Sequence, residues 1–303
     1  MKKLSAYITA MRLRTLPLSL AGVSLGLMLA ASDYVLRPWV AFFTLLTTVF
    51  LQILSNVANE LGDFLHGTDR EEDRQGPAYT LSKGLLAEKD FKVMIRVYVV
   101  LCIAGGLAMI WFSFGTFFDF GALITALMGL AAISGAVKYT LGRNPYGYRG
   151  LGDLYVFLFF GIVSVLGAYF VAAHEIRTWI LVLPAVSAGC LSTGVLNVNN
   201  IRDIRSDALT RRTIPVRIGE KNAKIYHTAL IAIGWLCMLV YASLRVFDWW
   251  HYLFVVTLPL FVLHLVQVWR RSGKDLDPQL PQLVMFSFLF AVLSGFGFIV
   301  YLL

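Results

Sequence analysis

The sequence predicts an all-α membrane protein, and three observations lead to that fold class. Of the 303 residues, 58% are hydrophobic and only 15% are charged, and the mean hydropathy is +0.72. Soluble domains carry about 25% charged residues, so this composition indicates a bilayer protein. The apolar residues form long continuous runs, and most of the charge lies between them. Such runs predict helices, because they are too long and continuous for the strands of a closed barrel.

A helix needs about 20 mostly apolar residues to cross the hydrocarbon core. Applied along the chain, this length predicts about nine transmembrane helices, which form a single domain over residues 1–303. The predicted spans lie near residues 16–32, 38–60, 92–112, 117–138, 152–173, 178–200, 224–244, 249–269 and 282–302. In the first span, the spacing of Gly22 and Gly26 predicts close helix packing rather than a phosphate-binding loop.

Lys and Arg gather on one side of the predicted membrane. If the N-terminus is cytoplasmic, only Arg37, Arg177 and Arg245 of the 26 basic residues lie on the outer side. Basic residues mark cytoplasmic loops, so the N-terminus is predicted to be cytoplasmic and, after an odd number of spans, the C-terminus outside. The same rule accounts for the net charge of +8. We therefore expect membrane lipid, and no nucleic acid, around this chain.

The acidic residues follow the basic ones to the cytoplasmic side, although the positive-inside rule does not require this. Most of them cluster after two helices that run inwards. The second predicted span ends in polar residues that share one helical face, Asn56, Asn59 and Asp63. Asp69 and Asp73 follow in a loop that Gly62 and Gly67 are expected to bend. The sixth span repeats the pattern with a stripe formed by Asn199, Asn200, Asp203 and Asp207.

Both acidic clusters lie at helix C-termini, where the helix dipole already disfavours negative charge. A carboxylate close to the membrane core costs a further 2.5–3.5 kcal/mol, roughly. Bound cations would offset both costs, and Mg²⁺ is the natural candidate because it takes oxygen ligands and bridges to phosphates. Cytoplasmic Lys83, Arg74 and Arg143 are candidates to complete the binding of a diphosphate. The alternative is a solvated loop whose acids pair with Arg202 and its neighbours.

At this point the chain resembles the UbiA-type intramembrane prenyltransferases over nearly its whole length. The stretches that carry the resemblance are Arg12–Pro17, Leu51–Asn59 with Asp73–Pro77, Tyr139–Asp153, and Val195–Asp203 with Arg217–Glu220. The nearest branch is that of menaquinone synthesis. The resemblance implies a bundle of nine helices around a central cavity, which the 61–92 and 201–224 loops cap. It implies a polyprenyl diphosphate as donor and 1,4-dihydroxy-2-naphthoate as acceptor, with release of diphosphate and CO₂ to give demethylmenaquinone.

Taken together, the residue pattern and the resemblance predict four groups of site residues. The predicted Mg²⁺ ligands are Asn59, Asp63, Asp69, Asn199, Asp203 and Asp207. The predicted diphosphate-binding residues are Lys83, Arg74, Arg143 and Arg202. Asp63, Asp203, Tyr139 and Arg143 are predicted to be catalytic, the last two at the positions of the family's Tyr-xxx-Lys element. Arg12, Arg14 and Asn56 are candidates to bind the acceptor, although both arginines also fit simple positive-inside flanking.

Three positions depart from the family pattern. Glu60 stands where the first Asp of the first motif is usual, Arg143 replaces the Lys of the third motif, and Arg211 occupies a position that often carries a further acid. Other acceptors, such as 4-hydroxybenzoate, a haem or a chlorophyll precursor, stay open. An ion-coupled transporter is a more distant alternative, disfavoured because the acids gather at one face rather than at the membrane midplane.

Overall fold

The computed structural model describes residues 2–67 and 80–300. Within these ranges, nine helical segments are long and apolar enough to cross a membrane, which confirms the predicted all-α fold and number of spans. The first half of the chain contains α1 (Lys2–Met11), η1 (Leu13–Thr15), α2 (Leu16–Asp33), α3 (Pro38–Leu65), α4 (Glu88–Phe114), α5 (Phe120–Lys138) and η2 (Tyr146–Arg149). The chain continues with α6 (Gly152–Val156), η3 (Phe157–Val163), α7 (Ser164–Ala173), η4 (Trp179–Leu181), α8 (Val182–Arg202) and α9 (Ile204–Thr210). The C-terminal part contains α10 (Ile214–Leu244), η5 (Trp249–Thr257), α11 (Leu258–Arg270), η6 (Gly273–Leu276) and α12 (Gln279–Val300).

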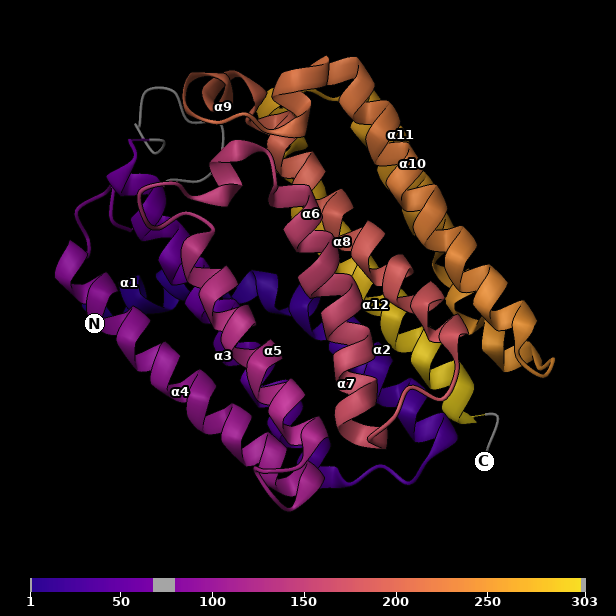
Figure 1. Ribbon diagram of the computed structural model, residues 1–303. Helices are drawn as coiled ribbons and strands as arrows, with labels where there is room; N and C mark the ends of the chain where they lie inside the picture. Colours follow the sequence, from indigo (N-terminus) through magenta and orange to yellow (C-terminus); the bar gives the residue numbers. More distant parts are fainter. Residues whose placement is uncertain (1, 68–79, 301–303) are drawn as a thin grey trace.

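The helices form two groups that meet along α2 and α7 (Figure 1). One group contains α3, α4 and α5, and the other contains α8, α10, α11 and α12. The second group has an aromatic core in which Trp235 packs against Phe254, Phe261 and Phe290, with ring centroids 5.0–5.7 Å apart. Such a core stabilises the second group through buried area and through edge-to-face contacts.

Close packing of α2 depends on its two glycines. A Cβ atom at Gly22 would lie 2.6 Å from the carbonyl oxygen of Phe160, and one at Gly26 would collide with the carbonyl oxygen of Val165. The predicted close helix packing at these glycines is therefore confirmed. Small residues at such positions let two helix backbones approach each other, which is the usual basis of helix association in membranes.

The two glycines near the end of α3 behave differently from each other. Gly67 adopts a positive φ of 68° just after the helix ends, as expected of a residue that bends the chain. Gly62 stays inside α3, and a Cβ atom there would lie 2.7 Å from the carbonyl oxygen of Thr140. The prediction that Gly62 bends the loop is therefore wrong, because its role is to let the end of α5 approach α3.

Several helices are less regular than the hydropathy pattern predicts. A left-handed residue, Arg12 at φ 49°, separates α1 from η1 and α2. The fifth span contains a π-helical stretch, η3, and the eighth begins with the long 3₁₀ segment η5. Helix α10 begins at Ile214, ten residues before the predicted span, and is interrupted at Gly219, whose φ is 78°.

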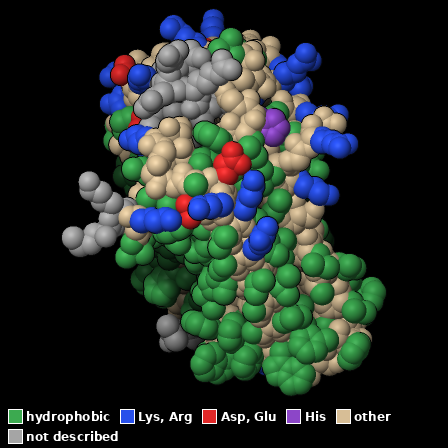
Figure 2. All heavy atoms as spheres, turned by 90° about the vertical axis from the view of Figure 1, so that its left-hand side faces the viewer, with side chains coloured by type: hydrophobic (Ala, Val, Ile, Leu, Met, Phe, Trp, Pro, Cys, Tyr) green, Lys and Arg blue, Asp and Glu red, His purple; other side chains and the backbone are tan. Residues whose placement is uncertain are grey.

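Charge and aromatic residues mark the two ends of the bundle. Figure 2 shows Lys and Arg side chains over the upper part of one face and an almost continuous hydrophobic surface below them. At the opposite end, Trp39, Trp111, Trp179 and Trp249 are exposed, as expected of side chains at a membrane interface. Asp33 also lies there, where it accepts hydrogen bonds from Tyr169 at 2.8 Å and from Arg245 at 2.8 Å. This end is therefore held together by ion pairs and hydrogen bonds.

Candidate active site

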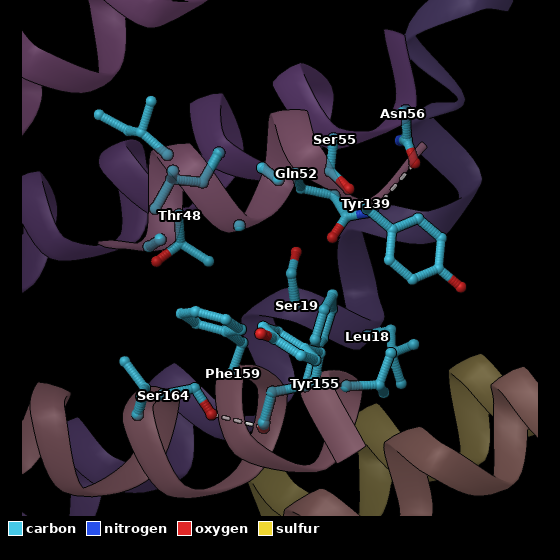
Figure 3. A pocket seen from close by; sticks show the side chains of 18 of the residues that line it. Leu18, Ser19, Thr48, Gln52, Ser55, Asn56, Tyr139, Tyr155, Phe159 and Ser164 are labelled. Atoms are coloured by element: carbon cyan, nitrogen blue, oxygen red, sulfur yellow. Dashed lines mark hydrogen bonds between the residues drawn. The ribbon is translucent and has the colours of Figure 1, made fainter. Parts of the chain in front are cut away.

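A cavity of about 610 Å³ lies between the helices and is lined by residues of α2 to α9. Its wall on α4 is apolar and includes Ile103, Leu107 and Ile110. Its wall on α3 is a polar stripe at helical spacing, formed by Thr44, Thr48, Gln52, Asn56, Asn59 and Asp63. Figure 3 shows part of this stripe facing Ser19, Tyr155 and Phe159 across the cavity. The cavity therefore has an extended apolar part and a polar end at which the stripe reaches Asp63.

Three predicted aspartates meet at the polar end of the cavity, which we call the mouth. Asp63 lies near the end of α3, Asp203 lies between α8 and α9, and Asp207 is in α9. All three line the cavity, and Asp63 and Asp207 are buried. Figure 1 shows α9 at the same end of the bundle as the end of α3. Two helix ends far apart in the sequence thus bring their carboxylates to one place, as the sequence predicts.

Arginine 211 joins two of these aspartates. Its guanidinium forms an ion pair with Asp63, and its Nε lies 3.8 Å from Oδ1 of Asp207. The Tyr148 hydroxyl donates a hydrogen bond of 2.7 Å to Oδ1 of Asp63, and its ring lies under the guanidinium at 4.7 Å. The His66 ring packs against the Tyr148 ring in an edge-to-face arrangement, at a centroid distance of 4.9 Å. Arg211, Tyr148 and Asp63 therefore form one connected group at the mouth.

Arginine 202 plays a corresponding part on the α8 side. Its Nε and Nη2 donate to the two carboxylate oxygens of Asp203 at 2.9 and 2.6 Å, and Nη2 also donates to Asn199 Oδ1 at 2.9 Å. A further ion pair joins it to Asp277 at 2.7 Å. Arg202, predicted to bind diphosphate, is thus buried, and its guanidinium is bound by Asp203, Asn199 and Asp277. Its diphosphate role stays a prediction.

The asparagines predicted to bind the metal, Asn59 and Asn199, and the one predicted to bind the acceptor, Asn56, differ in how their side chains are engaged. Asn59 and Asn199 both line the cavity, and Oδ1 of Asn59 accepts a hydrogen bond of 3.3 Å from Thr140. Asn56 donates to the carbonyl oxygen of Met11 and to Oγ1 of Thr15, both at 2.9 Å. Asn56 therefore ties the stripe on α3 to the bend before α2, while its edge still faces the cavity.

Arg12 and Glu60 form a second charged pair beside the cavity. The left-handed backbone of Arg12 places this residue in the cavity lining, with Nη2 3.7 Å from Oε2 of Glu60. The other oxygen of Glu60 accepts hydrogen bonds from Thr80 Oγ1 at 2.7 Å and from the Leu81 N–H at 3.1 Å. Glu60 is fully buried and lies outside the cavity lining. Its carboxylate is thus directed to Arg12 and to the chain that precedes α4.

The remaining predicted residues are spread over different places. Tyr139, at the end of α5, lines the cavity. Arg14, Lys83 and Arg143 are exposed and lie outside the cavity lining. Asp69 and Arg74, like Asp73, lie outside the described residues. The structure thus brings Tyr139 together with the aspartates, and it does not bring Arg143 or Lys83 to them.

Residues to which the sequence analysis gave no role in the site complete the mouth. Arg211 and Tyr148 are the main ones, and both belong to segments that carry the family resemblance or flank it. The only available signal was the unusual Arg at position 211, where an acid is common. Gln52 and Tyr155 also line the cavity and were not singled out.

Burial controls the protonation of the groups at the mouth. It raises the pKa of Asp207 to about 7, an effect that the nearby Arg211 partly offsets. It also raises the pKa of Tyr139 to about 12, so this phenol stays neutral and can donate a hydrogen bond at neutral pH. The pKa of the Arg211 guanidinium rises despite burial, because Asp63 and Asp207 stabilise its charge. The mouth is therefore a place of low dielectric where negative charge needs a cation.

The described residues at the mouth carry the type of ligand atom that Mg²⁺ prefers, but they do not form a complete coordination shell by themselves. Among the described residues, no three His, Cys, Asp or Glu side chains converge closely enough to hold an ion by themselves. The carboxylate and amide oxygens that line the mouth are nevertheless the hard donors that Mg²⁺ prefers. Mg²⁺ usually takes only one or two carboxylates and completes its shell with water and substrate phosphate. The donor set therefore suits a metal that arrives with a phosphorylated substrate.

Fold and site define a class: a multi-pass membrane protein with a cavity that is apolar along α4 and lined by carboxylate and amide oxygens at its mouth. Residues 19–290 match the model of the UbiA prenyltransferase family. The chain belongs to this family, which favours an enzyme over an ion-coupled transporter.

Curated relatives and solved structures agree with this membership. The 1,4-dihydroxy-2-naphthoate octaprenyltransferase of Haemophilus influenzae is 37% identical over 303 residues, which cover 99% of this chain and 97% of the relative. The protein of the same name from Escherichia coli is 38% identical over 274 residues, which cover 90% and 86%. A UbiA homologue of Aeropyrum pernix has the same fold, with a TM-score of 0.69 at 16% identity over 96% of this chain and 98% of that one. Another, from Archaeoglobus fulgidus and bound to DMAPP and Mg²⁺, has a TM-score of 0.66 at 16% identity over 97% and 99%.

Proposed function

We propose that this protein transfers a polyprenyl chain from polyprenyl diphosphate to 1,4-dihydroxy-2-naphthoate. The observation that carries the proposal is the cavity itself, whose apolar wall on α4 suits a prenyl chain and whose mouth offers oxygen ligands that would hold a diphosphate through Mg²⁺. The two relatives at 37% and 38% identity, both named for 1,4-dihydroxy-2-naphthoate, support this acceptor over 4-hydroxybenzoate.

The mouth residues have separate roles in this proposal. Asn59, Asp63, Asn199, Asp203 and Asp207 would hold Mg²⁺, with Asp69 added from the segment outside the described residues. Mg²⁺ bound there supplies positive charge to the leaving diphosphate. Tyr139, a neutral donor at the same end, would hydrogen-bond to a diphosphate oxygen as charge develops on it. Arg202, Arg143, Lys83 and Arg74 were predicted from the sequence as further diphosphate contacts, and Arg202 forms an ion pair with Asp203.

The transfer itself is a substitution at one ring carbon. The allylic C–O bond of the donor breaks, and its electron pair leaves with the diphosphate. The ring carbon that carries the carboxylate forms a bond with the prenyl carbon, and CO₂ then leaves in place of a proton. The product is the hydroquinone form of demethylmenaquinone, and no base has to remove a proton from the ring. The apolar walls keep water from the cationic prenyl carbon.

Arg12 is the best placed of the three candidates for acceptor binding. It lines the cavity, and its partner Glu60 lies behind it rather than in the cavity. A guanidinium binds a carboxylate bidentately, so Arg12 would hold the acceptor's carboxylate until CO₂ leaves. Asn56 and Gln52 are near it on α3, with their amides 3.1 Å apart, and would bind a ring hydroxyl.

The orientation in the membrane is part of the same proposal. The mouth lies at the end where nearly all Lys and Arg residues gather, so it faces the cytoplasm by the positive-inside rule. The N-terminus would then be cytoplasmic and the C-terminus outside, in the inner membrane of a bacterium. A core that joins residues from Ala21 to Phe298 supports a single domain over 1–303.

The decisive test is prenyl transfer by membranes that contain this protein. Labelled polyprenyl diphosphate and Mg²⁺ would be supplied with either 1,4-dihydroxy-2-naphthoate or 4-hydroxybenzoate, each with and without EDTA. We expect labelled product and CO₂ from the naphthoate alone, and no product in EDTA. Transfer to 4-hydroxybenzoate alone would keep the chemistry and overturn the acceptor. Transfer in EDTA would overturn the role of the metal.

A further inference from the structure

Arg211 stands where a cation is needed at the mouth, although no sequence motif marks it as a ligand-binding residue. Its side chain is 15% exposed and lines the cavity. It compensates Asp63 of α3 and Asp207 of α9, which belong to the two halves of the predicted metal site. The basic residues predicted to bind diphosphate from the loops, Lys83 and Arg143, are exposed instead. Arg211 is therefore a guanidinium that the cavity itself presents to a ligand at the mouth.

Contacts of the neighbouring residues Arg212 and Arg217 anchor the backbone around Arg211. The N–H of Arg212 donates to the carbonyl oxygen of Tyr148 at 3.0 Å. The Arg217 guanidinium donates to the carbonyl oxygens of Arg212 at 3.1 Å and Arg149 at 2.7 Å. These contacts hold the connection between α9 and α10 against η2. The long Arg211 side chain can then change partners at the mouth without moving the connection.

We propose that Arg211 is a diphosphate-binding residue that also serves as the counterion of Asp63 and Asp207 before the substrate binds. This inference rests on the proposed function. In the state described here, Arg211 neutralises the same carboxylate oxygens that a metal ion would need. When diphosphate and metal bind together, the guanidinium exchanges the aspartates for diphosphate oxygens, which it binds bidentately. The ring of Tyr148 supports the guanidinium from one side and its hydroxyl keeps Asp63 oriented.

This exchange couples the two ligands. Mg²⁺ alone would have to bind against the Arg211 ion pair, so its affinity is low. With diphosphate present, Arg211 gains a new anionic partner, and the metal affinity rises. By linkage, diphosphate binding is strengthened by the metal to the same extent. The mouth would therefore accept the metal–diphosphate complex in preference to either component.

The test measures binding rather than turnover, on the purified full-length protein in lipid nanodiscs. Mg²⁺ is titrated alone by calorimetry, and the magnesium pyrophosphate complex is titrated separately. In Arg211→Gln, which keeps hydrogen-bond donors but removes the charge, we expect Mg²⁺ alone to bind about 10-fold more tightly and the pyrophosphate complex about 10-fold more weakly. Arg212→Ala removes the same charge from an exposed neighbour and should change neither affinity.

A second readout protects the test against misfolding. Without Arg211 the two aspartates repel each other, so the thermal unfolding temperature of Arg211→Gln should fall in metal-free buffer and recover with Mg²⁺ more than that of the wild type. Arg211→Lys keeps the charge and should fold, with a smaller change in both affinities.

Equal Mg²⁺ affinity in the wild type and Arg211→Gln would overturn the counterion role. Equal affinity for the pyrophosphate complex would overturn the diphosphate role. If neither protein bound the complex at all, the proposed function itself would fail.

Discussion

At the mouth of the cavity, two arginines pair with the three aspartates. Arg211 pairs with Asp63 and Asp207, and Arg202 pairs with Asp203. Buried carboxylates of this kind destabilise the fold unless they are paired. Removing one partner of a buried ion pair destabilises the fold more than replacing both partners by apolar residues does. The two arginines thus explain how the protein tolerates an acidic mouth before substrate arrives. They also make the mouth sensitive to single substitutions.

Asp63→Asn keeps the shape of the side chain and removes its charge. If Asp63 binds the metal, turnover should fall by about 100-fold or more, the range seen when one stabilising group is lost from a transition state. The measurement is Mg²⁺-dependent prenyl transfer in membranes with equal amounts of folded protein. Asp275→Asn, a change at an exposed acid, is the matched control. Near-normal turnover in Asp63→Asn would remove this residue from the ligand set.

Arg12→Ala tests the acceptor site. Loss of a charge-assisted hydrogen bond costs about 1.5–3 kcal/mol, so the KM for 1,4-dihydroxy-2-naphthoate should rise by about 10-fold or more. The KM for polyprenyl diphosphate should stay the same, because Arg12 lies with Glu60 rather than with the aspartates. Arg14→Ala gives the comparison, because that side chain is exposed. A larger effect from Arg14 would reverse the assignment of the two arginines.

At the scale of whole helices, the packing of α2 on η3 and α7 decides where the cavity wall lies. Gly22 and Gly26 let these backbones approach, so a side chain at either position meets backbone atoms that cannot move away. Two of the glycines that line the cavity are different. At Gly106 and Gly129 an added Cβ meets nothing within 4 Å, because these positions face open space. Glycine thus has two roles here, one in packing and one in keeping the cavity wide.

Gly26→Ala and Gly106→Ala form a matched pair that separates these roles. The first forces a Cβ atom against the Val165 backbone, and overpacking of this kind costs about 1–3 kcal/mol. The second adds a methyl group in open space and should be neutral or stabilising by about 0.5–1 kcal/mol, because Ala favours the helix. Thermal unfolding in detergent should show a lower transition temperature for Gly26→Ala only. Equal temperatures would mean that α2 packs less closely than described.

At the scale of the whole molecule, the two ends of the bundle do different things. The end opposite the mouth is closed by Asp33 with Tyr169, Arg177 and Arg245. The end with the mouth carries the aspartates and most of the positive charge. This polarity gives the molecule one functional face, which is consistent with a water-soluble acceptor reaching the site from one side of the membrane.

Cysteine labelling tests this orientation. Lys221→Cys places a thiol on the exposed surface near the mouth, and Val246→Cys places one in the exposed turn between α10 and η5. A membrane-impermeant maleimide should label Val246→Cys in intact cells and Lys221→Cys only after the membrane is opened. Of the three natural cysteines, Cys102 and Cys190 are buried and Cys237 is half-buried, so labelling of the unsubstituted protein gives the background. The opposite pattern would place the mouth outside.

The sequence alone determined the fold class, the nine spans and the two helix ends that carry acidic residues. These features depend on local properties, hydropathy over about 20 residues and helical spacing, which can be read without knowing what packs against what. The irregular segments, such as the π-helical η3 and the break at Gly219, were not predicted, since no local pattern of hydropathy distinguishes them.

The tertiary structure decided which charges face the cavity. Arg211 reaches Asp63 across 148 residues of sequence, while Arg143 and Lys83, which are equally basic, remain exposed. Glu60 is next to a predicted ligand, yet it turns to Arg12 and to the chain before α4. The physical reason is that the direction of a side chain at the end of a helix depends on the helices and loops packed around it, and those neighbours come from distant parts of the chain.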